Sequence, residues 1–384
     1  MPSVPLPRRL RPLVTPFWNR LWWIPATLLA VAATAAFTCT PVMLTGRPVD
    51  LPAAYRAKAK NPFADTARLP LADPTNFAEF GPWSHGAKLT PRIVAALFLA
   101  AADRLGCHPY VPATLGGVVL LACVIVTTAR GTGDRFVGAC TGCAVAGLYA
   151  AADCFAIPFQ PKPFDGVALG MAGLAMLAAV SGPPALLAAA VAAGCLSDER
   201  AIVAAVACGW LATFASAPPG DTRRLAAIAG GVLIFGVTRI CLGAACGWSR
   251  SDMSLVDAEI LRHTFPVAGS ATWVAFEAAW APVGLLAAVA AATGRWRLCA
   301  AWLVTLAVSL ASCLVVLDTS RAAAFLIALV PAAWTGLAKV GLERNVMRPL
   351  AVATAVCCLA LPTYDVIAGV HSTPLEPLLL ALFR

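Results

Sequence analysis

The stretch PRIVAALFLAAADRLG, residues 91–106, decides how the chain is arranged, because the side on which every later loop lies depends on it. The stretch is apolar but shorter than the roughly 20 residues that a membrane-spanning helix needs. It also carries Arg92, Asp103 and Arg104. If residues 91–106 crossed a membrane, every later loop would change sides. If they lay at the membrane surface as an amphipathic helix, the later loops would not change sides.

The composition of the whole chain indicates an integral membrane protein. Of its 384 residues, 60% are hydrophobic and only 12% are charged, and the mean hydropathy is +0.80. Soluble domains average about 25% charged residues. Long Ala, Leu and Val runs without alternation favour helices over barrel strands, because a helix satisfies its own backbone polar groups. We therefore predict an all-α, polytopic membrane protein of about eleven transmembrane helices, each needing about 20 residues.

The predicted spans are the long apolar runs, and together they form a single polytopic domain over residues 1–384. The runs at 166–180 and 183–196 are short and separated by SGPP, which favours a tight helical hairpin over one kinked helix. The first run follows a basic tail, but it is long for the apolar part of a signal peptide, so we predict a retained helix. The predicted spans are 21–44, 110–129, 136–157, 166–180, 183–196, 200–217, 224–246, 272–293, 296–317, 321–340 and 348–369.

The distribution of basic residues favours the interfacial interpretation of 91–106. With that segment at the surface, one side of the membrane receives Arg8, Arg9, Arg11, Arg20, Arg130, Arg135, Arg223, Arg224, Arg295, Arg297, Lys339, Arg344 and Arg348. The short loops on the other side hold Lys162, Arg200, Arg250, Arg262 and Arg321. Cytoplasmic loops are rich in Lys and Arg, so the N-terminus is predicted to be cytoplasmic. Residues 45–109 then form a long extracytoplasmic loop that ends in a juxtamembrane helix, and 247–271 form a second such loop.

The formal net charge of +9 is explained by the Lys and Arg residues of the cytoplasmic loops. No nucleic-acid partner is therefore predicted. Membrane lipids are the expected surroundings. The high alanine content is typical of a GC-rich bacterium, and we therefore expect a multi-pass protein of the bacterial inner (cytoplasmic) membrane.

Four polar strings lie where apolar runs meet the extracytoplasmic side. They are LADPTNFAEFGPWSHGAKLTPRI (71–93), FQPKPFDGVALGMAGLAML (159–177), AAGCLSDERAIVAAV (192–206) and VVLDTSRAAAFLIALVP (315–331). Arginine offers a planar fork that suits a phosphate, and a carboxylate in a water-poor cleft can take a hydroxyl proton. The residues of interest in these strings are Asp73, Glu79, Arg92, Asp165, Glu199, Arg200, Asp318 and Arg321.

Each string also has a purely structural interpretation. Asp165 stands at a helix start, where it can cap free N–H groups. Ser197, with Asp198 and Glu199, reads as an N-cap and first turn. Asp318 can cap the next helix, and Asp73 and Glu79 can be ordinary solvated acids of a loop. The sequence leaves both interpretations open at every string.

Arg239 is the most unusual single residue, because it lies inside a predicted span. Charges within a membrane are costly and are usually paired or functional. Arg239 can bridge to Glu277 in the next span or extend to the membrane surface. The other interpretation is that Arg239 joins Arg200 and Arg321 in a cationic pocket for a phosphate.

An acidic first outer loop, a juxtamembrane helix and later spans with acidic outer ends together resemble the GT-C superfamily of polytopic glycosyltransferases. The resemblance covers residues from roughly 60 to 325 and consists of an arrangement of short motifs. It implies transfer of a sugar from a polyprenyl-phosphate donor to an extracytoplasmic glycan or protein acceptor. It further implies that Asp73 or Glu79 acts as general base or helps to hold a divalent cation (Mg or Mn), and that Asp165 is the second acidic position. Substrate binding then falls to Arg92, Glu199, Arg200, Arg239, Asp318 and Arg321, and no metal ligands are assigned.

The main alternative is a non-enzymatic protein, either a transporter or a component of envelope-polysaccharide export or assembly. A transporter places polar groups near the middle of the bilayer on broken helices. Here the charges are predicted at the outer ends of the spans, and Arg239, Glu277 and Asp153 are the deeper exceptions. A third reading is a GT-C-like member that keeps the fold and has lost activity.

Overall fold

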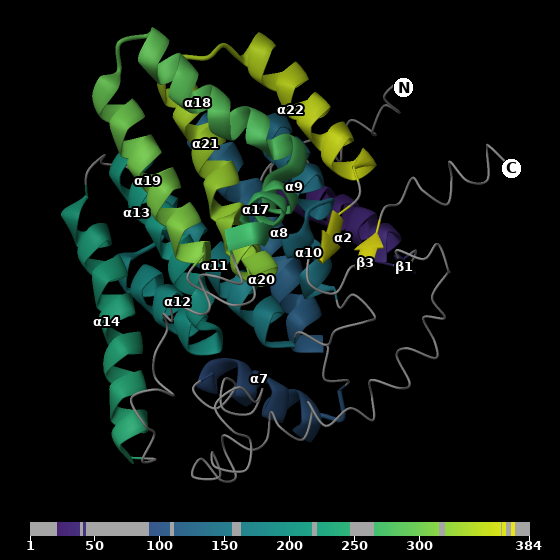
Figure 1. Ribbon diagram of the computed structural model, residues 1–384, viewed down its shortest axis with the longest axis vertical. Helices are drawn as coiled ribbons and strands as arrows, with labels where there is room; N and C mark the ends of the chain where they lie inside the picture. Colours follow the sequence, from purple (N-terminus) through teal and green to yellow (C-terminus); the bar gives the residue numbers. More distant parts are fainter. Residues whose placement is uncertain are drawn as a thin grey trace, which may run out of the picture.

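The computed structural model describes residues 21–38, 41–43, 92–107, 111–155, 163–216, 221–245, 265–314, 319–361, 363–365 and 370–372. In these residues the chain is almost entirely helical, and the helices pack side by side in one bundle (Figure 1). The all-α prediction is confirmed at this level, and the predicted residues Asp73, Glu79 and Asp318 lie outside the described residues.

The longer helices are α2 (Trp23–Thr38), α7 (Ile93–Arg104), α8 (Val111–Thr132), α9 (Arg135–Ala146), α11 (Pro163–Ser181), α12 (Pro184–Ser197), α13 (Ile202–Phe214), α14 (Thr222–Ala245), α17 (Ala268–Phe276), α18 (Trp280–Ala292), α19 (Trp296–Leu314), α21 (Leu329–Lys339) and α22 (Arg344–Ala360). Short elements join them: α10 (Tyr149–Cys154), α20 (Thr319–Ala324) and the 3₁₀ turns η2 (Glu199–Ala201), η3 (Phe265–Val267), η4 (Glu277–Ala279) and η5 (Phe325–Ala328).

Six helical stretches in the described part of the chain are long and apolar enough to cross a membrane, so the predicted count of about eleven is not confirmed. They are Val111–Thr132, Phe164–Ser181, Thr222–Ala245, Ala268–Ala292, Trp296–Leu314 and Arg321–Lys339. Shorter apolar helices cover Trp23–Ala35, Ile93–Ala102, Arg135–Ala146 and Pro184–Ser197. The pair α11 and α12 forms two separate helices that pack against each other, as the SGPP break predicted.

Two predicted spans are too long at their C-terminal ends. The span predicted for 21–44 is helical only to Thr38, and the span predicted for 348–369 is helical only to Ala360. A proline follows shortly in each case, at Pro41 and Pro362, and the residue before a proline avoids the helical conformation. The chain then forms short strands β1 (Pro41–Met43), β2 (Thr363–Asp365) and β3 (Val370–Ser372), which pair antiparallel in the order β1-β3-β2.

Three other predicted spans are interrupted, and one of them, 321–340, passes through the 3₁₀ turn η5. The segment 136–157 breaks at Gly147, where a Cβ atom would lie 2.4 Å from the carbonyl oxygen of Cys358 in α22. The segment 272–293 breaks at Glu277, whose backbone φ of 45° lies in the left-handed region. Neither of the breaks at Gly147 and Glu277 follows from hydropathy, because each depends on the local backbone and on a neighbouring helix.

The centre of the bundle is formed by the close contact of α8 with α11. A Cβ atom on Gly116 would lie 2.0 Å from the carbonyl oxygen of Gly166, and one on Gly170 would lie 2.7 Å from Cα of Gly116. Only glycine lets the two backbones approach so closely, which is how helices often associate in membranes. A second packed region lies between α13, α18 and α19, where the buried Trp302 contacts Trp210 and donates its Nε1–H to the carbonyl oxygen of Val283 at 2.9 Å.

The two ends of the bundle differ in charge. At one end, which we call the basic end, Arg130 contacts Ser181, Arg224 donates to the carbonyl oxygen of Ala178, and Arg348 pairs with Asp134 at 2.8 Å. These arginines belong to loops that the sequence placed together on one side. At the opposite end, α7 lies across the ends of other helices, at the bottom of Figure 1. This is the arrangement expected of an interfacial helix, although its contact with a lipid surface stays a prediction.

Candidate functional site

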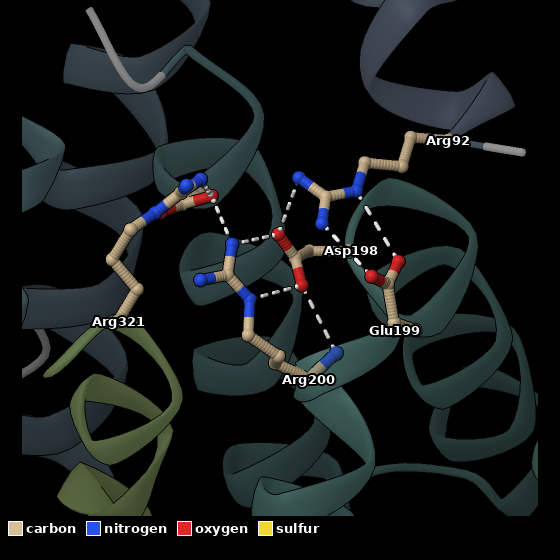
Figure 2. A network of polar contacts seen from close by, with 6 residues as sticks. Arg92, Asp198, Glu199, Arg200 and Arg321 are labelled. Carbon is tan, nitrogen blue, oxygen red and sulfur yellow. Dashed lines mark hydrogen bonds and ion pairs between the residues drawn. The ribbon is translucent and has the colours of Figure 1, made fainter. Parts of the chain in front are cut away.

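Six charged side chains meet at the end of the bundle where α7 lies (Figure 2). They come from four separate segments: the residue that precedes α7, the first turn of α11, the junction of α12 with α13, and α20. We call them the charge cluster, which consists of Arg92, Asp165, Asp198, Glu199, Arg200 and Arg321.

The junction between α12 and α13 carries half of the cluster because the backbone makes a tight turn there. Asp198 has an extended backbone and accepts a hydrogen bond from the N–H of Arg200 at 3.0 Å, so it caps η2. The hydroxyl of Ser197 instead donates to the carbonyl oxygen of Ala193, so Ser197 is not the cap. The turn directs Asp198, Glu199 and Arg200 into one buried region.

Arg92 holds the start of α7 against this turn. Its Nε and Nη2 donate to the two carboxylate oxygens of Glu199 at 3.2 and 2.9 Å, and its Nη1 lies 2.9 Å from Oδ2 of Asp198. A two-point contact of this kind fixes the plane of both groups. Apolar contacts of Ala95, Ala96 and Leu99 with α11 add to the attachment of α7.

Arg200 lies at the centre of the cluster and is almost fully buried. Its Nε donates to Oδ1 of Asp198 at 2.7 Å, and its Nη2 contacts both Oδ2 of Asp198 and Oδ1 of Asp165, the latter at 2.9 Å. Arg200 therefore connects the α12–α13 junction to the start of α11.

Arg321 approaches Asp165 from α20. Its Nε and Nη2 donate to Oδ2 and Oδ1 of this carboxylate, whose side chain has no exposed surface. The cluster thus pairs three arginines with three carboxylates. Such pairing is what permits buried charges, because a buried charge without a partner is strongly destabilising.

The two carboxyl groups at the α12–α13 junction have pKa values that are shifted in opposite directions. Burial raises the pKa of Glu199, but the charge and hydrogen bonds of Arg92 outweigh burial and lower this pKa from 4.5 to about 2. For Asp198, burial is the larger effect and its pKa is raised despite Arg200 and Arg92. Glu199 is therefore a fixed negative charge at neutral pH.

Arg239 lies beside the cluster on α14. Its Nε and Nη1 are buried and have no hydrogen-bond partner among the described residues. Its charge interacts with Glu199 and Arg92. Within the described residues it makes no ion pair with Glu277, so the bridge considered from the sequence is not supported. Arg239 instead adds positive charge to one side of an otherwise balanced cluster.

The structure brings together Arg92, Asp165, Glu199, Arg200 and Arg321, all of which the sequence had singled out, and it places Arg239 beside them. Asp198 was interpreted only as part of a helix cap, yet it contacts two arginines of the cluster. Its position between Ser197 and Glu199 in a charged string was the available signal. Whether Asp73, Glu79 and Asp318 approach the cluster falls outside the described residues.

The described residues do not fit the divalent cation that the family resemblance implied. Both oxygens of Asp165 accept hydrogen bonds from arginines, and both oxygens of Glu199 accept from Arg92. A cation needs several oxygen ligands that no arginine occupies. Among the described residues, no three His, Cys, Asp or Glu side chains are grouped as metal ligands.

In comparisons with known proteins, no family, no curated protein and no solved structure matches this chain. The functional argument therefore depends on the chemistry of the cluster. Guanidinium groups that now bind carboxylates can also bind phosphate oxygens with the same two-point geometry. Arg239 is the group best placed to do so, because its buried Nε and Nη1 have no hydrogen-bond partner among the described residues.

Proposed function

We propose that this protein is a GT-C-like membrane glycosyltransferase, which moves a sugar from a polyprenyl-phosphate donor to an acceptor on the extracytoplasmic side. The observation that carries the proposal is the convergence of charged residues from four distant segments into one buried cluster at the end where α7 lies. A protein that only fills the bilayer has no need of such a cluster, and buried ionisable groups in membrane proteins mark functional sites.

In this proposal the arginines stabilise the phosphate that leaves the sugar. Arg239 makes the first contact, and Arg321 and Arg200 supply further positive charge as the phosphate forms. Asp165 holds the guanidinium groups of Arg200 and Arg321 in place, so its contacts favour a positioning role. The general base that activates the acceptor hydroxyl is assigned to Asp73 or Glu79.

The surface of α14 supports access of a lipid-linked donor from within the membrane. Leu233, Ile234, Val237 and Ile240 are exposed on this helix, and they surround Arg239 in sequence. An apolar polyprenyl chain can lie along such a surface while its phosphate reaches Arg239. The donor would therefore enter sideways from the lipid bilayer, without its apolar chain passing through water.

The experiment that tests the proposal measures the polyprenyl phosphate retained by the purified full chain, by mass spectrometry. We expect Arg239→Gln to lower retention at least about tenfold, since a charged hydrogen bond contributes about 1.5–3 kcal/mol. Arg104→Gln is the matched control, because Arg104 is exposed and outside the cluster. If the unchanged protein retained only bulk phospholipid, the donor assignment would be wrong.

Sugar transfer is tested separately from donor binding. Asp73→Asn and Glu79→Gln are expected to abolish or strongly reduce release of polyprenyl phosphate from a labelled donor, while donor retention stays unchanged. A protein that binds the donor but releases no polyprenyl phosphate would be the inactive GT-C-like member. Unchanged transfer in both variants would contradict the mechanism.

One feature favours a non-enzymatic transporter or export component as the second candidate. Glu277 is buried near the middle of the stretch Ala268–Ala292, at a break between α17 and α18, with a left-handed φ of 45°. A non-glycine residue in this conformation is strained, and strained residues often mark functional sites. Flux of a labelled glycolipid or glycan in proteoliposomes, without chemical change and lost in Glu277→Gln, would favour this candidate.

A further inference from the structure

A groove of about 700 Å³ runs between α9 and α22 at the basic end of the bundle. Its walls include Phe136 of α9 and Arg348, Val352 and Val356 of α22. The groove is shallow and wide open, so it resembles a furrow along the bundle surface more than an enclosed cavity. The groove opens on the outer surface of the bundle, where α22 lies along one edge in Figure 1.

The sequence of α22 divides the groove into a charged part and an apolar part. Arg344, Arg348, Val352 and Val356 follow one another at intervals of four residues, so they lie on one stripe of the helix. Val352 and Val356 are 41% and 59% exposed, and Phe136, whose ring centroid lies 5.9 Å from Cζ of Arg348, is 47% exposed. Exposed apolar side chains in this order favour contact with a hydrocarbon chain.

The length of the apolar part fits one leaflet of a membrane. At 1.5 Å per residue, Val356 lies roughly 12 Å from Arg348 along the helix. Half of a hydrocarbon core of about 30 Å is about 15 Å. A lipid whose phosphate lies at Arg348 would therefore have most of one chain beside the apolar stripe.

The charged part is suited to a negatively charged headgroup. Nε of Arg348 contacts Asp134, and among the described residues its two Nη groups make no hydrogen bond, so they remain available. Nη2 of Arg344, one turn away, donates to the carbonyl oxygen of Gly133 at 3.3 Å. Arg135 at the start of α9 adds a further positive charge on the same end, beside the ring of Trp22. Two carboxylates lie near these three arginines, those of Asp134 and of Glu343 at the start of α22, so positive charge is in excess here.

We propose that the groove between α9 and α22 binds an anionic phospholipid, with its phosphate at Arg344 and Arg348 and one acyl chain along Val352 and Val356. This site lies at the basic end, away from the charge cluster, and does not depend on the proposed transferase function. A second copy of the chain is disfavoured as the occupant, because a symmetric contact through this surface would bring the same arginines together. A zwitterionic lipid would use only part of the positive charge.

The test measures binding of phosphatidylglycerol and phosphatidylcholine to the full chain in detergent, by native mass spectrometry. We expect Arg344→Gln/Arg348→Gln to weaken phosphatidylglycerol binding about tenfold to 30-fold, because each basic residue near an anionic lipid contributes a factor of about five. The matched control, Arg223→Gln/Arg297→Gln, removes the same charge from the same end but not from the groove. Equal weakening in both pairs, or equal binding of the two lipids to the unchanged protein, would overturn the proposal.

A second variant tests the position of the acyl chain without changing any charge. Ala353→Trp fills the groove and is expected to weaken phosphatidylglycerol binding at least about fivefold while the unfolding temperature is maintained. Unchanged binding in Ala353→Trp would show that the chain lies elsewhere and would contradict the proposed site. If Arg344→Gln/Arg348→Gln also formed stable dimers and the unchanged protein did not, the surface would be a suppressed contact between copies instead.

Discussion

At the residue scale, the charge cluster is governed by the balance between its arginines and its carboxylates. Asp165 is the most constrained of these side chains, because it has no exposed surface and contacts both Arg200 and Arg321. Removing one partner from a buried group of this kind leaves a charge without compensation. The cost of such a loss is commonly 3–5 kcal/mol.

We expect Asp165→Asn to lower the free energy of unfolding by about 3–5 kcal/mol. The double variant Asp165→Asn/Arg321→Gln restores the charge balance, so it should be less destabilised than the sum of the two single changes. The measurement is a double-mutant cycle of unfolding in mixed micelles. Additive effects would show that Asp165 and Arg321 are not energetically coupled.

The lowered pKa of Glu199 predicts a dependence of stability on pH. A carboxyl group whose pKa is depressed in the folded state stabilises the protein fully above its ordinary pKa, and this stabilisation is lost as the pH falls toward the folded pKa. For Glu199 this stabilisation is lost over the pH range from its ordinary pKa of 4.5 down to its folded-state pKa of about 2. The difference in unfolding temperature between the unchanged protein and Glu199→Gln should thus be constant from pH 6 to 8 and shrink below about pH 4.5.

The control for this pH dependence is Arg104→Gln, which is exposed and remote from the cluster. Its unfolding temperature should follow that of the unchanged protein at every pH. If the difference in unfolding temperature between the unchanged protein and Glu199→Gln grew on acidification, the pKa of Glu199 would not be lowered in the folded state.

At the scale of elements, the contact between α8 and α11 depends on the absence of side chains. Gly116 and Gly170 approach the opposite backbone so closely that a methyl group on either would overlap it. Gly236 on α14 has open space around its Cα, with nothing within 4 Å of an added Cβ. These positions form a matched pair for testing the contact.

We expect Gly116→Ala to destabilise the bundle by about 1–3 kcal/mol, because the helices must move apart. Gly236→Ala should be neutral or stabilising by up to about 1 kcal/mol, since alanine is the better helix former. Unfolding of both variants in the same detergent checks the prediction. Equal stability of the two variants would mean that α8 and α11 are farther apart than described.

At the scale of the whole molecule, the charge cluster and the basic end lie at opposite ends of the bundle. The positive-inside rule predicts that the basic end faces the cytoplasm. The proposed transferase site and the proposed phospholipid site would then face opposite leaflets. Each site could therefore be altered without directly affecting the other.

This assignment predicts which thiols an impermeant maleimide reaches in intact cells. Cys107 is exposed and follows α7, so it should react from outside. A cysteine introduced by Glu343→Cys at the exposed basic end should react only after the membrane is permeabilised. Peptide mass spectrometry separates these positions from the other thiols, and the reverse pattern would show that the orientation is inverted.

The sequence by itself predicted an all-α membrane protein and most of the residues that form the charge cluster. Hydropathy is a local property, so it predicts which segments form apolar helices, six of which in the described part of the chain are long enough to cross a membrane. The strings that hold Asp165, Glu199, Arg200 and Arg321 were recognisable for the same reason, because each charge ends an apolar run.

Only the tertiary structure decided which of these charges meet and where the helices break. Arg321 binds Asp165 across 156 positions of sequence, and Arg92 reaches both Asp198 and Glu199, pairings that no local pattern encodes. The break at Gly147 depends on the backbone of α22, which lies far along the chain. Local hydropathy specifies which segments leave water, whereas the packing of those segments specifies their partners.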